Sequence, residues 1–280
     1  MTEVWWSFTH AWWFWPLALF ALTFLFGVVA VLAGVGGGVL FVPIVGGFFP
    51  FHLDYVRAAG LTLALSGALS AGPTLLRTGI ASLRLAMPLA LVGSITSIIG
   101  ALAGFYVPER TMQAVLGAVI LIIAALMLLA GEGGLEGAHR DDPLGRWLQL
   151  HGKGWRVHRT AAGMVCFAVI GLVCGLFGLG AGWANVPTLF LVMGAPLKMA
   201  VATSSLSISI INASAALIYI ERGAVLPLIV APSILGVMLG ARLGAVLLKS
   251  AKPRLIRLLV IAVLLLSGAR ALLKGLGLWT

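Results

Sequence analysis

Apolar residues occupy the chain in long runs, and short polar or charged connections separate one run from the next. About 20 consecutive apolar residues let a helix cross a bilayer. The pattern therefore predicts membrane-spanning helices along most of the chain. We expect helical segments at residues 16–33, 39–50, 58–76, 85–106 and 111–130, and again at 161–177, 183–193, 199–220, 224–248 and 258–273.

Two glycine-rich stretches interrupt these runs. Gly34–Gly38 is followed by Pro43, and the related stretch Gly178–Gly182 is followed by Pro187 at a constant distance of 144 residues. Each glycine costs about 1 kcal/mol relative to alanine in a helix, so we expect a helix break at both places. Unwound backbone at membrane depth is tolerated only where protein or a water-filled cavity covers it. Two matching interruptions in two halves of a chain are typical of a transporter site.

The similarity between the two halves extends beyond the glycines, at a spacing of 140 to 144 residues. The matching positions include Ala59, Thr62 and Ser66 with Ala200, Thr203 and Ser207, and Gly100 and Gly104 with Gly240 and Gly244. We therefore expect an N-terminal interfacial segment rich in tryptophan at 1–15, a first transmembrane repeat at 16–130, a polar loop at 131–160, a second repeat at 161–273 and a tail at 274–280.

The composition supports a membrane protein. Of the 280 residues, 61% are apolar and 9% are charged, and the mean hydropathy is +1.13. A soluble domain is usually about a quarter charged, so we expect an all-α, multi-pass membrane protein. The net charge is +10, but the basic residues lie mostly at helix ends and in one loop. This placement indicates membrane topology and contact with anionic lipids rather than nucleic acid, and a positive rim can also attract an anionic substrate.

The basic residues also discriminate between two topologies. If each glycine break is a hairpin turn, twelve basic residues share the face of the 131–160 loop and five share the other face. If each broken segment crosses the membrane once, the division is ten against seven. The positive-inside rule favours the first arrangement. It predicts inverted repeats, each a glycine-broken hairpin plus three transmembrane helices, with a cytoplasmic loop and both termini outside.

Three groups of residues are candidates for substrate binding. Freed backbone N–H groups at the breaks present positive potential that suits sulfite, sulfonate or carboxylate, although small residues there can also serve close helix packing. Hydroxyl side chains recur along two predicted helices, and Asn185 and Asn212 add to this polar set. The hydroxyls can donate to an anion or to the carbonyl four residues earlier in their own helix. Arg242 lies inside an apolar segment, which suggests function, or lies shallow enough to reach the interface. The candidates are Gly36, Gly37, Gly38, Pro43, Thr62, Ser66, Gly180, Ala181, Gly182, Asn185, Pro187, Thr203, Ser204, Ser207 and Arg242.

Some chemistries are disfavoured by what the predicted spans lack. No Asp, Glu or His lies in the middle of a predicted span, which argues against a proton antiporter with a buried carboxylate and against an enzyme with a Ser–His pair. The histidines and aspartates of the central loop match no standard metal spacing. We expect no metal and no cofactor, with a small anion and membrane lipids as partners and homodimer formation left open. An anion channel, a carrier of other anions such as carboxylates, and a non-transporting subunit are the alternatives.

The motifs together resemble the TauE/SafE sulfite exporter family. The resemblance rests on G-x-GGG-x4-P at 34–43, its relative at 178–187, Ala-x2-Thr-Ser at 200–204 and the sequence GARLG at 240–244. It implies a secondary transporter that exports sulfite, sulfoacetate or related organosulfonates across the bacterial inner membrane, by alternating access between two repeats. It also implies a binding role for Gly36–Gly38, Pro43, Gly180–Gly182, Pro187, Thr62 and Thr203. The chain departs from the motifs at Leu63, where no serine follows Thr62, and at Ala181 within the second glycine run.

Overall fold

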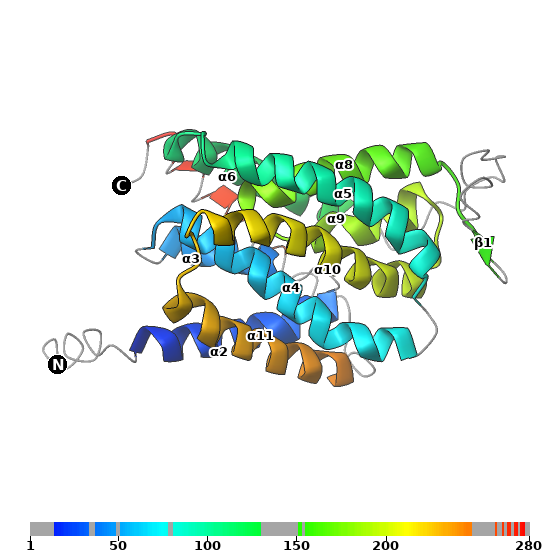
Figure 1. Ribbon diagram of the computed structural model, residues 1–280, viewed down its shortest axis with the longest axis horizontal. Helices are drawn as coiled ribbons and strands as arrows, with labels where there is room; N and C mark the ends of the chain where they lie inside the picture. Colours follow the sequence, from blue (N-terminus) through cyan, green and yellow to red (C-terminus); the bar gives the residue numbers. More distant parts are fainter. Residues whose placement is uncertain are drawn as a thin grey trace, which may run out of the picture.

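The described part of the chain is a bundle of α-helices with one short β-hairpin, as the computed structural model shows (Figure 1). The hairpin pairs β1 (His151–Gly152) with β2 (Trp155–Arg156). The all-helical prediction for the membrane part is confirmed. The structure describes residues 14–33, 37–48, 51–77, 81–129, 151–152 and 155–247, and scattered positions between 261 and 277.

The helices lie close to the predicted segments. The last predicted segment, 258–273, falls mostly outside the described residues. The first half contains α2 (Phe14–Ala33), α3 (Gly37–Phe48), α4 (Leu53–Arg77), α5 (Leu83–Gly104) and α6 (Glu109–Leu129). The second half contains α8 (Thr160–Phe177), α9 (Gly182–Pro187), the π-helical η1 (Thr188–Val192), α10 (Leu197–Glu221) and α11 (Pro227–Leu247).

The largest difference from prediction is the start of α4, which we expected at residue 58. The helix begins at Leu53, so that Asp54 and Arg57 form its first turns rather than a connection. A carboxylate in the first turn of a helix is stabilised by the helix dipole, and Asp54 also pairs with Arg57 three residues later. Asp54 and Arg57, which the sequence pattern assigns to a connection, thus lie in the first turns of a helix.

Four of the described helices are long and apolar enough to cross a membrane. They are Leu83–Gly104, Thr160–Phe177, Ala202–Glu221 and Pro227–Gly244. Shorter apolar helices cover Trp15–Ala30, Gly37–Gly46 and Arg110–Ile122. The chain is therefore a multi-pass membrane protein.

Glycines bring two pairs of helices into backbone contact. A Cβ on Gly240 of α11 would collide with the Phe24 carbonyl of α2, and a Cβ on Gly100 of α5 would collide with the Leu172 carbonyl of α8. Small residues allow this close approach. Gly100 and Gly240 are equivalent positions of the two sequence halves, so α2 and α8 each pack against a helix of the opposite half.

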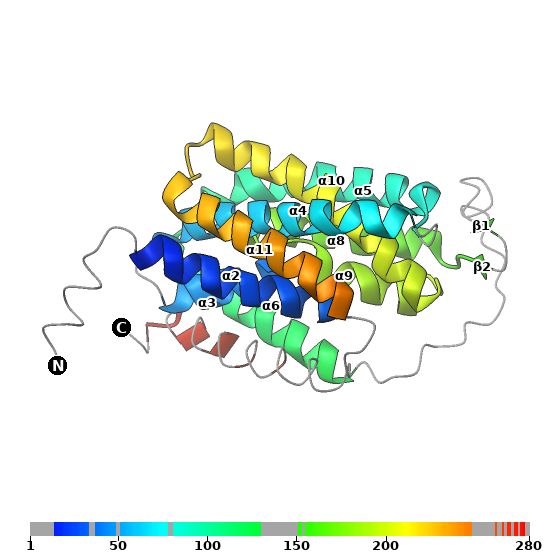
Figure 2. The same ribbon diagram turned by 90° about the horizontal axis from the view of Figure 1, so that it is seen from below.

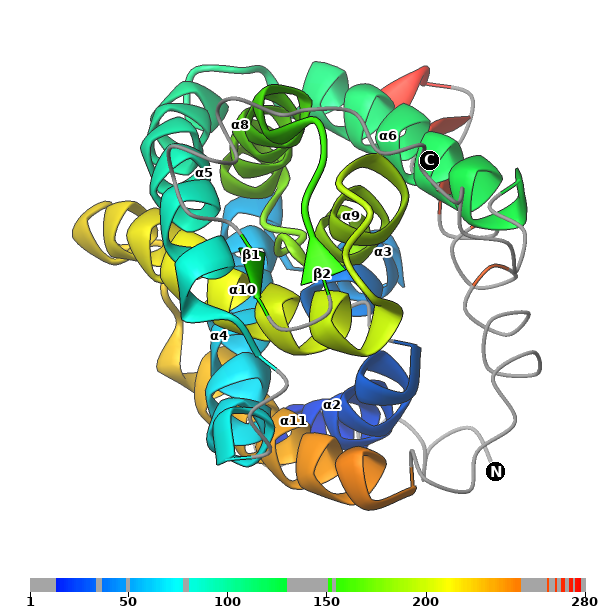
Figure 3. The same ribbon diagram turned by 90° about the vertical axis from the view of Figure 1, so that its right-hand side faces the viewer.

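The centre of the bundle holds α4 and α10, which pack against each other. In Figures 1 and 2, α4 runs towards the end that carries the β-hairpin and α10 runs away from it. Figure 3 looks along the bundle and shows α3 and α9 close together in projection, whereas Figure 2 places them towards opposite ends. The two short helices therefore start near the middle of the bundle, where the breaks lie.

Candidate functional site

The second glycine stretch breaks the helix as the sequence predicts. Helix α8 ends at Phe177, and α9 begins at Gly182. Between them Gly178 and Gly180 have φ of +67° and +75°, a left-handed backbone that glycine adopts without strain. The Gly178 N–H donates to the Cys174 carbonyl at 2.9 Å and closes the end of α8.

The first stretch is described only in part. Residues 34–36, and with them the candidate Gly36, lie outside the described residues. Gly37 and Gly38 belong to the first turn of α3 rather than to an unwound segment. First-turn N–H groups have no partner within their own helix, and these two glycines occupy such positions. Pro43 is buried inside α3.

The start of α3 and the second break touch each other through the backbone. A Cβ added to Gly38 would lie 2.5 Å from the Gly60 carbonyl oxygen and 2.9 Å from the Leu179 carbonyl oxygen. Gly60 of α4 in turn contacts the Gly178 carbonyl. Two stretches that are 144 residues apart in the sequence therefore meet at α4, and side chains at these glycines would separate them.

Asn212 of α10 is hydrogen-bonded to the backbone of the second break. Its Oδ1 accepts from the Ala181 N–H at 3.3 Å and from the Cys174 thiol at 3.0 Å. Its Nδ2 has no hydrogen-bond partner among the described residues. A Cβ added to Gly180 would lie 3.4 Å from this Nδ2, so the free amide N–H groups lie beside the unwound backbone.

Two further buried polar side chains flank the same region without a partner in the described chain. Asn185 of α9 has neither its Oδ1 nor its Nδ2 bonded, and the Ser204 hydroxyl of α10 is also unbonded. Both side chains are at most 1% exposed. An unsatisfied buried polar group costs about 1–3 kcal/mol. Helices α9 and α10, which carry these groups, pack against each other.

Most of the other candidate hydroxyls are engaged within their own helices. The Thr62 hydroxyl donates to the Ala59 carbonyl at 2.8 Å and the Ser66 hydroxyl to the Thr62 carbonyl at 2.7 Å. The Ser207 hydroxyl does the same with the Thr203 carbonyl at 3.2 Å. This arrangement matches the alternative in which hydroxyls bond their i−4 or i−3 carbonyl.

Thr203, Pro187 and Arg242 have different surroundings. The Thr203 hydroxyl oxygen accepts from the Ser82 N–H at 3.1 Å and joins α10 to the start of α5. Pro187 is exposed at the end of α9, and Arg242 is exposed on α11. Of the candidate residues, the structure therefore gathers Gly38, Gly180, Ala181 and Gly182 around the breaks, with Asn185 in the α9 helix that follows. Ser204 lies on α10, eight residues before Asn212.

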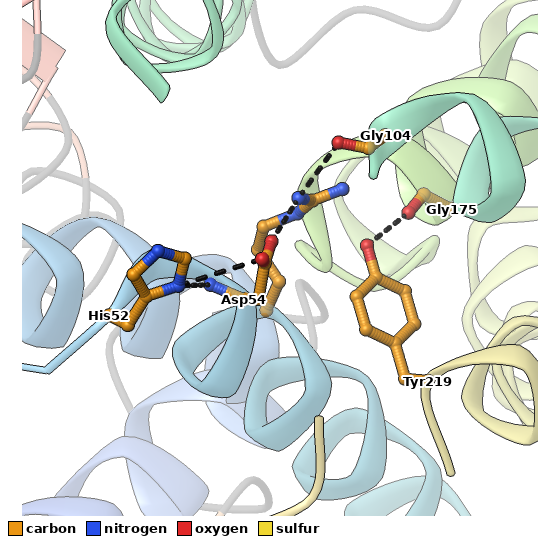
Figure 4. Close-up of polar contacts among 6 residues, drawn as sticks. His52, Asp54, Gly104, Gly175 and Tyr219 are labelled. Carbon is orange, nitrogen blue, oxygen red and sulfur yellow. Dashed lines mark hydrogen bonds and ion pairs between the residues drawn. The ribbon is translucent and has the colours of Figure 1, made fainter. Parts of the chain in front are cut away.

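The burial of Arg57 was not predicted from the sequence. The sequence pattern places this residue in a charged connection, but the side chain is only 2% exposed. Its Nη1 donates to Asp54 Oδ1 at 2.7 Å and to the Gly104 carbonyl oxygen at 3.3 Å (Figure 4). The guanidinium Cζ lies 5.3 Å from the centre of the Tyr219 ring. The one sequence signal was the spacing of Asp54 and Arg57, which suits an i,i+3 pair on a helix.

A cavity of about 220 Å³ opens beside Arg57. It lies where the first turns of α4 meet the end of α5, and Asp54 is the only carboxylate among its described lining residues. The Arg57 backbone also contacts Gly178, so the cavity adjoins the second break. Its lining residues are His52, Leu53, Asp54, Arg57, Gly104, Phe105, Val107 and Met112.

Comparison with known proteins places most of the chain within one family. The family model described as "Sulfite exporter TauE/SafE" matches residues 19–271. The probable membrane transporter protein YfcA of Escherichia coli K12 is 26% identical over 264 residues, which cover 92% of this chain and 90% of YfcA. The probable membrane transporter protein YunE of Bacillus subtilis is 28% identical over 163 residues, or 56% of this chain, and the match spans only 58% of YunE. No solved structure matches the chain.

Proposed function

We propose, from the premise that this chain belongs to the TauE/SafE sulfite exporter family of membrane transporters, that it exports small sulfur-containing anions such as sulfite or sulfoacetate across the bacterial inner membrane. The observation that carries the proposal is the set of unpaired buried donors around the second break. They are the Asn212 and Asn185 amides and the Ser204 hydroxyl.

The chemistry of these donors favours an anion over a cation. The described buried polar residues include no Asp or Glu, whereas a hard cation such as Ca²⁺ or Mg²⁺ is held by carboxylate and carbonyl oxygens. Neutral N–H and O–H groups bind an oxyanion by donating to it, and they do not trap it by a strong opposite charge. Gly180 adds backbone that a ligand can approach closely.

The arrangement of the helices supports two inverted repeats. Helices α4 and α10 hold equivalent sequence positions and run in opposite directions in Figure 1. Helix α2 packs on α11 and α8 packs on α5, which is the exchange of partners expected from a two-fold relation between the halves. Inverted repeats that carry the substrate near their interface are the usual basis of alternating access.

Export is favoured by the membrane potential. An anion that leaves an inside-negative cell gains about 2.3 kcal/mol per charge per 100 mV. Outward transport therefore needs no coupled cation. Equal initial export from proteoliposomes with and without an imposed inside-negative potential would contradict this part of the proposal.

Transport measurements on the Ser204→Ala variant test the site. A hydrogen bond to a charged group contributes about 1.5–3 kcal/mol, so the KM for sulfite in proteoliposome counterflow should rise about ten- to hundredfold. Ser209→Ala is the matched control on the same helix, because the Ser209 hydroxyl donates to the Ser205 carbonyl at 3.0 Å. An unchanged KM in Ser204→Ala would refute the site. Unsaturable ohmic current would indicate a channel, and equal transport of acetate would overturn the sulfur-anion assignment.

A further inference from the structure

The Arg57 guanidinium is separate from the donors around Asn212, and its free edge has no assigned role. We propose that this edge, together with the cavity beside it, forms a second oxyanion site through which the transported anion passes at the end of the bundle remote from the β-hairpin. The inference rests on the proposed function for the identity of the anion. In Figure 4, dashed lines mark the bonds that the guanidinium makes with the labelled Asp54 and Gly104.

The pairing of the guanidinium leaves its bidentate edge free. Asp54 and the Gly104 carbonyl both bond to Nη1, whereas Nε and Nη2 have no hydrogen-bond partner among the described residues. The N–H groups on Nε and Nη2 lie on the same edge of the planar group. Such a fork binds two oxygens of one oxyanion in parallel, which is the strongest geometry that arginine offers.

The charges around the guanidinium leave room for an anion. Asp54 contacts Arg57 through one oxygen, and its other oxygen lies 3.5 Å from His52 Nδ1. Arg222 brings a second guanidinium to the Phe105 ring, 5.7 Å from its centre. Among the described lining residues, Asp54 is the only carboxylate. In the described part of the chain, Asp54 is thus the carboxylate that pairs with the Arg57 guanidinium, and Arg222 adds a second positive charge beside Phe105.

The shape of the site fixes the guanidinium and leaves space next to it. The centres of the Phe105 and Tyr219 rings lie 5.9 and 5.3 Å from the Arg57 Cζ and 5.0 Å from each other, so both rings pack on the same side of the guanidinium. Gly104 lies against Nη2, where a Cβ would collide with it. A water molecule occupies about 30 Å³ in the liquid. The cavity of about 220 Å³ therefore takes a small oxyanion together with some of its hydration water.

Asp54 gives the site a means of release. A buried arginine without a counter-ion would bind an anion tightly and slow its exit. Asp54 competes with the anion for the same positive charge at 2.7 Å. The carboxylate therefore keeps binding weak enough for transit, and the anion binds and leaves without separating the Arg57–Asp54 pair.

The opposing interpretation is that Arg57 only fastens α4 to the end of α5. Both interpretations predict that Arg57 substitutions impair the protein. They differ in the change of anion affinity that they predict for Asp54→Asn. A purely structural pair loses stability and gains no affinity when Asp54 is neutralised. A binding site binds the anion more tightly, because the competing carboxylate is gone.

The experiment measures sulfite binding by calorimetry to the full chain in phosphatidylcholine nanodiscs. Two binding events are expected for the unmodified protein. Asp54→Asn should tighten one event at least tenfold, and Arg57→Lys, which keeps the charge but not the fork, should abolish that event. Gly104→Ala should weaken it by displacing Nη2. Arg84→Gln is the control, because it removes an exposed positive charge at the opposite end of α5.

The remaining outcomes separate this inference from the proposed function and from lipid binding. Loss of the other event alone in Ser204→Ala would confirm that the two sites are distinct. If sulfite binding depends on Arg57 but the protein transports no sulfur anion, the proposed function is refuted and the Arg57 site is supported. Retention of both events in Arg57→Lys, or weaker binding in Asp54→Asn, would refute the site. Disappearance of the Arg57 event in phosphatidylglycerol nanodiscs would overturn the proposal, because a lipid headgroup would then be its occupant.

Discussion

Gly180→Ala is the sharpest single test of the second break. Gly180 has φ of +75°, and an L-residue in the left-handed region costs about 1–2 kcal/mol. The new Cβ would also lie 2.7 Å from the Ala64 Cβ of α4. Neither Cβ can rotate away, so α4 and the break must move apart, at an overpacking cost of about 1–3 kcal/mol. The two terms together predict a destabilisation of about 2–5 kcal/mol.

Two measurements separate a binding role from packing. Thermal melting in detergent reports the stability, and sulfite counterflow at a temperature well below melting reports the KM. A substrate site at the break predicts a higher KM in the molecules that remain folded, because the Asn212 amide is displaced together with the backbone. A packing role alone predicts fewer folded molecules with an unchanged KM.

Gly67→Ala is the matched control on α4. Its Cβ would lie 3.7 Å from Val237 Cγ2, which is an ordinary contact, and alanine improves helix propensity by up to about 1 kcal/mol. We expect equal or higher melting temperature and unchanged transport in this variant. The reasoning is refuted if Gly180→Ala melts and transports like Gly67→Ala.

Two further substitutions test the packing between the halves. Tyr219→Phe removes the hydroxyl that donates to the Gly175 carbonyl at 2.8 Å, so the free energy of unfolding should fall by about 1–2 kcal/mol in melting experiments. Tyr106→Phe, at an exposed position, is the control and should leave the stability unchanged. Gly100→Ala pushes α5 off the α8 backbone and should reduce the yield of folded protein, whereas Gly72→Ala, with no neighbour within 4 Å of its Cβ, should be neutral. Normal stability in Gly100→Ala would contradict the close α5–α8 contact.

The sequence predicts the helices and the second break because both depend on local chemistry. Apolar runs of sufficient length define the helices, and the glycines of 178–182 cannot stay helical at low cost. The repeat of the glycine pattern after 144 residues further predicts that the two stretches form one site. The contact of Gly38 with Leu179 agrees with this expectation. Local rules and the repeat together were enough for this part of the structure.

The direction of each hydroxyl and the burial of Arg57 could not be predicted in the same way. Ser66 and Ser204 are both serines within predicted spans, yet one bonds its own helix and the other has no partner among the described residues. The difference depends on rotamers and on the neighbouring helix. Arg57 is buried by Gly104 and Phe105, which lie almost 50 residues later. Only the tertiary packing of α4 against the end of α5 brings them together.

The glycine contacts constrain how access could alternate. Helices α2 and α11 meet backbone to backbone at Gly240, and α5 and α8 meet in the same way at Gly100. Each pair joins one helix from each sequence half, so a movement that separated the halves completely would have to pull both contacts apart. The donors around Asn212 lie instead beside α4, α9 and the second break, where several buried polar atoms are unsatisfied. Densely packed pairs resist deformation, so we expect α2 to move with α11 and α5 with α8, and the change in access to occur between these pairs and the central helices.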